Sequence, residues 1–220
     1  VSEAMLQQTR VETAIAYWLR FMAALPTVQA LARASEDEVL TLWSGLGYYR
    51  RARALLETAR IIAGERGGAF PRTREELVAL PGIGPYTAGA VLSIAFDLPE
   101  PLVDGNVTRV LARVFAIEDD VTRARVKRKL WELAAGLVPE SGGAGDWNQA
   151  LMELGAGVCL PRDPGCGGCP LRPHCAAYRA GSVERLPRLP ERVPARPVEL
   201  VAVLAERRGE LLLERRAEHG

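Results

Sequence analysis

The four cysteines of the chain all lie in one short segment, CLPRDPGCGGCPLRPHC, with the spacing C-x6-C-x2-C-x5-C. They are Cys159, Cys166, Cys169 and Cys175. Four thiols in one loop indicate sulfurs that converge on a metal site, and both zinc and a [4Fe–4S] cluster accept four cysteines. Structural zinc usually has two closely spaced cysteine pairs, whereas only Cys166 and Cys169 form one here. The spacing therefore favours an iron–sulfur cluster over zinc, and disulfides, which are typical of short secreted chains, come last.

A second segment with chemical potential is LPGIGPYTAGAVL, residues 80–92, between two predicted helices. Gly82 and Gly84 permit a tight turn and bring backbone N–H groups to the start of the second helix. Such a helix start binds phosphate, and it would hold a nucleic-acid backbone without reading the bases. A plain turn between two helices, with glycine present for steric reasons, is the alternative.

Composition is that of an ordinary globular protein, with 48% hydrophobic and 25% charged residues among 220. The net charge is only +1, so nucleic-acid binding would depend on local basic clusters such as 50–53 and 123–129. We expect no secretory leader and no membrane span, because the longest apolar runs are too short to cross a bilayer. The chain starts at Val1 and stops within a strand-like pattern, so we expect a piece of a longer protein.

Residues 1–180 show helical patterns almost throughout, which predicts an all-α architecture. A first amphipathic helix is predicted over residues 8–22, with Val11, Ile15, Trp18 and Met22 on its apolar face. Residues 35–38, SEDE, have the pattern of a capping box that opens the next helix. Further helices are predicted over 50–63, from Thr73, and over 85–96, 107–116, 122–138 and 146–158.

The composition changes at residue 183. Residues 183–197, VERLPRLPERVPARP, are rich in proline and arginine and predict a semi-rigid linker rather than a helix. Beyond it, VELVAVLAERRGELLLERR contains two alternating apolar runs around Arg208 and Gly209. This pattern predicts a β-hairpin that opens a separate, truncated domain.

Taken together, LPGIGPYTAGA, VDGNVTRVLAR and the cysteine loop resemble the helix-hairpin-helix DNA glycosylases that carry an iron–sulfur cluster. SEAMLQQTRV and LWSGLGYYRRAR narrow the resemblance to the MutY-type adenine DNA glycosylases, which remove adenine mispaired with 8-oxoguanine. The resemblance covers residues 1 to about 180. It implies a six-helix barrel with the hairpin over 1–100, an iron–sulfur cluster domain over 101–182, the linker over 183–197 and the start of a Nudix-like domain over 198–220.

Hydrolysis of a purine N-glycosidic bond requires an acid that protonates the base and a group that stabilises the oxocarbenium-like sugar. The resemblance implies that Glu3 is the acid on adenine N7, that Asp104 faces the sugar C1′ and that Asn106 orients Asp104 or water. For both carboxylates a structural role at a helix terminus is the alternative. Tyr86 occupies the position of the Schiff-base lysine in endonuclease III-type enzymes, so the resemblance implies a monofunctional enzyme that leaves the strand intact.

An enzyme that acts on a base must first take it out of the stack. Gln7, Gln8 and Tyr48 match family residues that wedge into the duplex, and Gln149 matches a contact to the extruded adenine; a helix surface or core packing is the alternative for each. The resemblance thus implies a monomeric enzyme of the bacterial cytoplasm with a [4Fe–4S] cluster. Its substrate would be double-stranded DNA with A:8-oxoguanine or A:G mispairs.

Overall fold

The computed structural model describes residues 1–190, 198–199, 206–207 and 209–211. Contacts divide the chain into two units, Val1–Leu189 and Pro190–Gly220. Within the described residues, none of the helices has the length and apolar character needed to span a bilayer.

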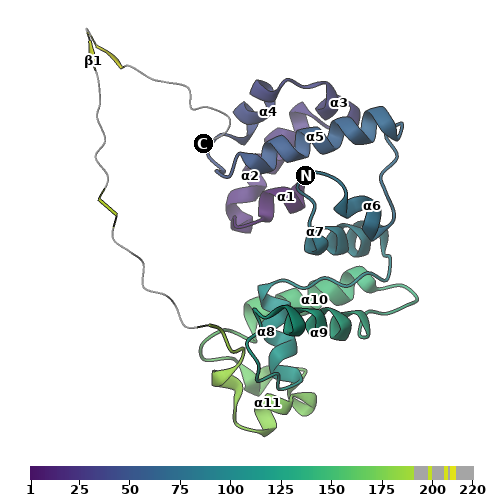
Figure 1. Cartoon of the computed structure of the whole chain (residues 1–220), viewed down its shortest axis with the longest axis vertical. Helices are drawn as coiled ribbons and strands as arrows, with labels where there is room; N and C mark the ends of the chain where they lie inside the picture. The colour runs from purple at the N-terminus through teal and green to yellow at the C-terminus, as the bar shows by residue number, and fades with distance from the viewer. Residues whose placement is uncertain (191–197, 200–205, 208, 212–220) are drawn as a thin grey trace. The chain divides into compact units, whose positions relative to one another are not determined.

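The first unit is built from helices (Figure 1). They are α1 (Ser2–Leu6), α2 (Val11–Ala24), α3 (Val28–Arg33), α4 (Glu36–Trp43), α5 (Arg50–Glu65), α6 (Arg74–Val78), α7 (Pro85–Ala90), α8 (Gly105–Val114), α9 (Ala124–Ala135), α10 (Ala144–Gly157) and α11 (Ala176–Arg179). A π-helical turn, Val91–Ala95, continues α7, and short 3-10 turns lie in the cysteine loop. In this unit, the only extended pairing among described residues is an isolated bridge between Asp120 and Arg188. The all-α prediction is confirmed.

Helix starts follow the capping signals of the sequence. Ser35 Oγ accepts a hydrogen bond from the Glu38 amide (3.2 Å), and Glu38 accepts one from the Ser35 amide (2.8 Å), which completes the predicted capping box of α4. Thr73 caps α6 in the same way through the amide of Glu76. These local signals therefore fix the start of α4, which carries Trp43, and the start of α6, which precedes the glycine hairpin.

The predicted apolar face of the first long helix is wrong. Val11, Ile15 and Trp18 are 57%, 52% and 38% exposed, whereas Ala14 and Phe21 are buried. Phe21 packs edge-on against Trp43 of α4, with ring centroids 6.2 Å apart. α2 carries two apolar stripes, and the stripe with Ala14 and Phe21 belongs to the core because Phe21 packs against Trp43.

Buried side chains fall into three clusters along the first unit. Two lie within residues 5–59 and 62–92, and the third joins α8, α9 and α10, which lie side by side in Figure 1. In the third cluster Leu102, Val107 and Leu111 are completely or almost completely buried. This packing fixes the start of α8, where Asp104 lies. A domain division near residue 100 stays a prediction.

The segment that follows α11 stays bonded to the helical unit: Arg113 of α8 donates to the Val183 and Leu186 carbonyls, and the Val121 amide donates to the Arg188 carbonyl. Residues Val183–Arg185 form a 3-10 turn, and Leu186 is buried. The predicted linker therefore begins with residues that are part of the fold, and its residues 191–197 lie outside the described ones. In the second unit, β1 (Glu206–Arg207) pairs antiparallel with β2 (Glu210–Leu211) around Gly209. The hairpin turn is as predicted, but most of the expected Nudix-like segment lies outside the described residues.

Candidate active site and four-thiol cavity

An open cleft of roughly 1670 Å³, counted with the solvent at its mouth, lies in the first unit. Its walls come from α1, the first half of α5 and the turn before it, the glycine hairpin and α7. Among its lining residues are the predicted site residues Glu3, Gln7, Gln8, Tyr48 and Gly82. The structure thus brings together residues that are up to about eighty positions apart in the sequence.

Glu3 is half-buried on α1, and Tyr86 and Asp104 lie close enough to affect the pKa of its carboxyl group. Burial raises the pKa of Glu3, the charge of Asp104 adds to this, and the Tyr86 hydroxyl opposes it. Burial and the carboxylates of Glu3 and Asp104 also raise the pKa of Tyr86 well above its usual range. Glu3 is therefore a carboxyl group whose proton is retained to higher pH than usual, beside a tyrosine that stays neutral.

Asp104 occupies the N-cap of α8, where its carboxylate is held by two donors. Oδ1 accepts a hydrogen bond from the Val107 amide (2.7 Å), and Oδ2 accepts one from the Asn106 side-chain amide (3.1 Å). The helix cap, which was the structural alternative for Asp104, is thus present, and Asn106 is bonded to the carboxylate, whereas a catalytic role of either residue stays a prediction. The same geometry fixes the carboxylate position and leaves it an acceptor, which suits a group that faces positive charge.

Arg109 extends this arrangement toward the cysteine loop and was missed in the sequence. Its guanidinium donates to Asn106 Oδ1 (2.8 Å), to the Gly155 carbonyl (2.8 Å) and to the Cys159 carbonyl (2.7 Å). Gly155 is required there, because a Cβ atom would lie 2.6 Å from the Asn106 Cβ. The only available signal was the three-residue step from Asn106 to Arg109, which places both on one face of α8.

Gln8 and Tyr48 share an unusual backbone conformation at the edge of the cleft. Both are non-glycine residues with positive φ, 58° and 49°, and both are exposed, Tyr48 to 61%. Such strain persists only where surrounding contacts enforce it, and it gathers at functional sites. Neither side chain packs in the core, which removes the packing alternative for Tyr48.

Arg51 supplies contacts that hold these two turns. Its guanidinium donates to the carbonyls of Ala4 (3.0 Å), Met5 (3.2 Å) and Gln7, and it lies over the Tyr48 ring at 5.1 Å. The basic cluster at 50–53 is therefore not available to phosphates as a whole, because the guanidinium of Arg51 binds backbone carbonyls of the protein itself. Arg53 is likewise paired with Glu36 at 2.7 Å.

The glycine hairpin connects α6 to α7. Gly82 has φ +72°, and a Cβ atom there would lie 2.7 Å from the Ala54 Cβ, so both the turn and the close approach to α5 require glycine. Gly84 is the N-cap of α7, with open space where a side chain would begin. In front of it, the first amides of α7 are free of a side-chain cap. This is the local arrangement that the phosphate prediction needs.

Gln149 lies on α10 and is not among the residues that line the cleft. Its side-chain amide donates to the Gly145 carbonyl one turn earlier (3.2 Å). One turn later on the same helix, the Met152 sulfur accepts a hydrogen bond from the Tyr86 hydroxyl (3.6 Å). This face of α10 therefore approaches Tyr86, whereas a contact of Gln149 to a base stays a prediction.

The four cysteines line one cavity together with Val110, Arg113 and Leu171. All four thiols are free, and burial together with the three other thiols raises the pKa of Cys166. In the described part of the chain, no three Cys, His, Asp or Glu side chains are grouped as ligands of a single metal ion would be. The loop thus gathers the four thiols around one common cavity.

A buried cation forms one wall of this cavity. Arg113 is only 1% exposed, and its guanidinium donates to Cys159 Sγ (3.3 Å) and to the carbonyls of Leu160 (2.6 Å) and Leu186 (2.8 Å). No carboxylate pairs with it among the described residues. A buried charge without an opposite charge is costly, so the wall is built for an anionic neighbour such as a set of thiolates.

Comparison with known proteins gives consistent relatives. The chain is 54% identical to an adenine DNA glycosylase of Rattus norvegicus, over 86% of this chain and 37% of the relative. It is 52% identical to one of Homo sapiens, over 84% and 34%, and 44% identical to one of Buchnera aphidicola, over 81% and 51%. The chain therefore spans about a third to a half of the length of these curated relatives.

Solved structures share the fold of the first unit. A thermostable thymine-DNA glycosylase superposes with a TM-score of 0.73 at 30% identity, covering 81% of this chain and 82% of the other. An endonuclease III in a non-covalent DNA complex superposes with a TM-score of 0.67 at 23% identity, covering 82% of each chain. A family model for base excision DNA repair proteins of the HhH-GPD superfamily matches residues 1–135. With this match over more than half of its length, the chain belongs to the HhH-GPD superfamily of base excision DNA repair proteins.

Proposed function

We propose that this chain is the catalytic part of an adenine DNA glycosylase, which hydrolyses the N-glycosidic bond of adenine paired with 8-oxoguanine or guanine. The observation that carries the proposal is the pair of dissimilar carboxyl groups: Glu3, whose pKa is raised by burial, and Asp104, held by two donors at a helix start. Two carboxyl groups in different environments are what acid-assisted glycoside cleavage uses. The adenine DNA glycosylases among the relatives support adenine as the base.

In this mechanism Glu3 donates its proton to the leaving adenine, which turns the base into a neutral leaving group. Positive charge then develops on the sugar, and the Asp104 carboxylate stabilises it. A water molecule adds at C1′, and the proton that it loses restores the Glu3 carboxyl group. Asn106 and the Val107 amide keep that carboxylate in place, so little reorganisation is needed as the charge forms. Tyr86 stays protonated and has no amine, so it cannot form a Schiff base, and the strand remains intact.

The cleft would hold the distorted duplex. Gln8 and Tyr48 are exposed and held at fixed positions, so they are suited to fill the gap left by an extruded base. Gln7 donates to the Thr87 hydroxyl (3.1 Å), which ties the end of α1 to α7 and leaves Gln8 as the more accessible of the two glutamines. The amides at the start of α7 would bind the phosphate backbone.

The cysteine loop fits a [4Fe–4S] cluster. The four thiols line one cavity, and each iron of such a cluster takes one thiolate. The spacing, with a single closely spaced pair, favours the cluster over zinc. Cys159, Cys166, Cys169 and Cys175 would hold the cluster, and Arg113 would balance its negative charge. The cluster would supply structural cross-linking of the loop, because hydrolysis of a glycosidic bond needs no redox step.

A pH profile tests the role of Glu3. Because burial raises its pKa, the reactive protonated form persists above the ordinary pKa of 4.5 and is lost as the pH rises further. We expect the single-turnover rate of adenine release to fall through an apparent pKa above 4.5 as the pH increases. The Glu3→Gln variant should lose this limb, and a rate that is independent of pH in the wild type would contradict the assignment.

The substrate is tested with three duplexes that carry A:8-oxoguanine, A:G and thymine glycol, each analysed with and without alkali. We expect adenine release from the first two, with strand breaks only after alkali treatment. Borohydride added during the reaction should trap no covalent adduct, because Tyr86 cannot form an imine. Strand breaks without alkali, or release of thymine glycol in place of adenine, would replace the proposal with a bifunctional pyrimidine glycosylase.

A further inference from the structure

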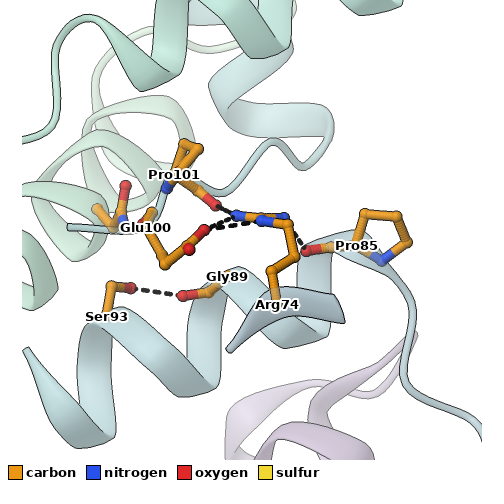
Figure 2. Close-up of polar contacts among 7 residues, drawn as sticks. Arg74, Pro85, Gly89, Ser93, Glu100 and Pro101 are labelled. Carbon is orange, nitrogen blue, oxygen red and sulfur yellow. Dashed lines mark hydrogen bonds and ion pairs between the residues drawn. The ribbon is translucent and has the colours of Figure 1, made fainter. Parts of the chain in front are cut away.

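One guanidinium bridges the two sides of the proposed active site. Arg74, in the first turn of α6, donates to the carbonyl of Pro85 (3.0 Å), the residue before Tyr86. It also donates to the Glu100 carboxylate (2.7 Å) and to the Pro101 carbonyl (2.7 Å), which lies three residues before Asp104. Figure 2 shows Arg74 between Pro85 on one side and the pair Glu100 and Pro101 on the other.

The segment that Arg74 holds is the direct connection to Asp104. Residues 99–103 contain no helix and run from the π-helical turn to α8. Pro99 and Pro101 restrict the backbone of this connection, and Leu102 anchors it as a completely buried side chain. Because Asp104 caps α8 through its own carboxylate, a displacement of residues 99–103 would move the cap and the carboxylate together.

α7 approaches this segment so closely that only glycine fits. A Cβ atom on Gly89 would lie 2.1 Å from the Pro101 carbonyl oxygen and 3.3 Å from the Arg74 guanidinium. From the other side, the Asn148 side chain donates to the Glu100 carbonyl (2.9 Å) from α10. Glu100 is thus held by α6 through Arg74 and by α10 through Asn148. Arg74 also bonds to Pro85, the first residue of α7, and so links Glu100 to α7.

We propose that Arg74 is a positioning residue for the glycosylase reaction. It binds the Pro85 carbonyl on one side and the Glu100 carboxylate and Pro101 carbonyl on the other. These bonds fix the distance from Asp104 to Tyr86 and to the neighbouring Glu3. The proposal rests on the proposed function. The planar fork of arginine presents donors in several directions, so one side chain reaches both walls. A lysine would offer one compact charge and could not bridge them with the same geometry.

The test compares Arg74→Met with Arg72→Met in single-turnover adenine release. Arg72 lies two residues away, is exposed and stacks on Phe96, so its replacement removes the same charge without touching residues 99–103. A separate reaction with excess substrate gives the fraction of active enzyme from its burst amplitude. This fraction distinguishes a variant that is partly misfolded from one that is folded but slow. We expect Arg74→Met to lower the rate constant of the active molecules about 10–100-fold, since small displacements of reacting groups have effects of this size. Arg74→Lys should lie between, and Arg72→Met should match the wild type.

A binding measurement keeps the inference separate from the proposed function. Duplexes carry either a cationic pyrrolidine abasic analogue or a neutral tetrahydrofuran analogue, and the ratio of the two Kd values reports whether Asp104 faces the sugar. We expect Arg74→Met to reduce this preference about tenfold or more while Kd for the neutral analogue stays within about threefold. If the wild type releases no adenine, the proposed function fails, and this ratio still tests Arg74.

A purely structural role predicts a different pattern. In that case Arg74→Met would lower the melting temperature or the active fraction, while the rate constant and the Kd ratio would equal those of Arg72→Met. That result would overturn the inference. If Arg74→Met does not fold, Glu100→Gln, which keeps the shape and removes the charge of the pair, takes its place in both measurements.

Discussion

Replacing Asp104 by asparagine is expected to reduce the single-turnover rate of adenine release by about 10³-fold or more, because it removes the carboxylate charge that stabilises the developing sugar cation in the proposed mechanism. The variant separates two roles of the residue. Asparagine is as good an N-cap as aspartate, so its side-chain oxygen can still accept from the Val107 amide and start α8. Folding and mismatch binding should therefore remain close to those of the wild type, and the loss should be in the chemical step.

Two further variants, Asp104→Ala and Glu3→Gln, distinguish loss of the helix cap from loss of catalysis. Asp104→Ala removes cap and charge, and we expect it to cost about 1 kcal/mol of folding free energy in addition to the catalytic loss. Glu3→Gln should reduce the rate by a further independent route, about 10²–10⁴-fold, because adenine then leaves without a proton donor. Gel-shift affinity for an A:8-oxoguanine duplex serves as the control for both. Release by Asp104→Asn within tenfold of the wild type would mean that the residue is only a helix cap.

The parts of the fold that the sequence predicted well depend on local chemistry. The capping box at Ser35 and the threonine cap at Thr73 fix helix starts through side chains three residues away, so they are visible in a short stretch of sequence. The cysteine loop is partly local, because two short 3-10 turns lie between its thiols, but Arg113 of α8 also contacts Cys159 and completes the cavity. Asp104 and Asn106 also bond within one helical turn.

The parts that the sequence did not predict depend on contacts between distant segments. Both stripes of α2 are apolar, and only the fit of Phe21 against Trp43 decides which one is buried. The arginines show the same limit more clearly. Arg51 belongs to a basic cluster by sequence, yet it binds carbonyls more than forty residues away. A buried arginine looks like an exposed one until its partners are known, and nothing in the local pattern distinguishes them.

Arg113 is a second such case, and its replacement by methionine is expected to lower the free energy of unfolding by about 1–3 kcal/mol or more, the cost of leaving buried acceptors without a donor. Its guanidinium joins α8 to two other segments, through Cys159 Sγ and the carbonyls of Leu160 and Pro161 after α10, and through the carbonyls of Val183 and Leu186. Methionine fills a similar volume but leaves these buried acceptors without donors and removes the positive wall of the thiol cavity. Urea unfolding and iron content per polypeptide measure the two effects.

Arg162→Met is the matched control, since it removes the same charge from an exposed position of the same loop and should change stability by less than about 0.5 kcal/mol. Arg113→Lys separates charge from geometry, because lysine keeps the positive charge but has no planar group that can reach the acceptors of both segments. If the charge alone matters, Arg113→Lys should retain iron as the wild type does. If the planar fork is needed, Arg113→Lys should lose stability and iron almost as Arg113→Met does, and the five hydrogen-bond acceptors around the guanidinium favour this second result.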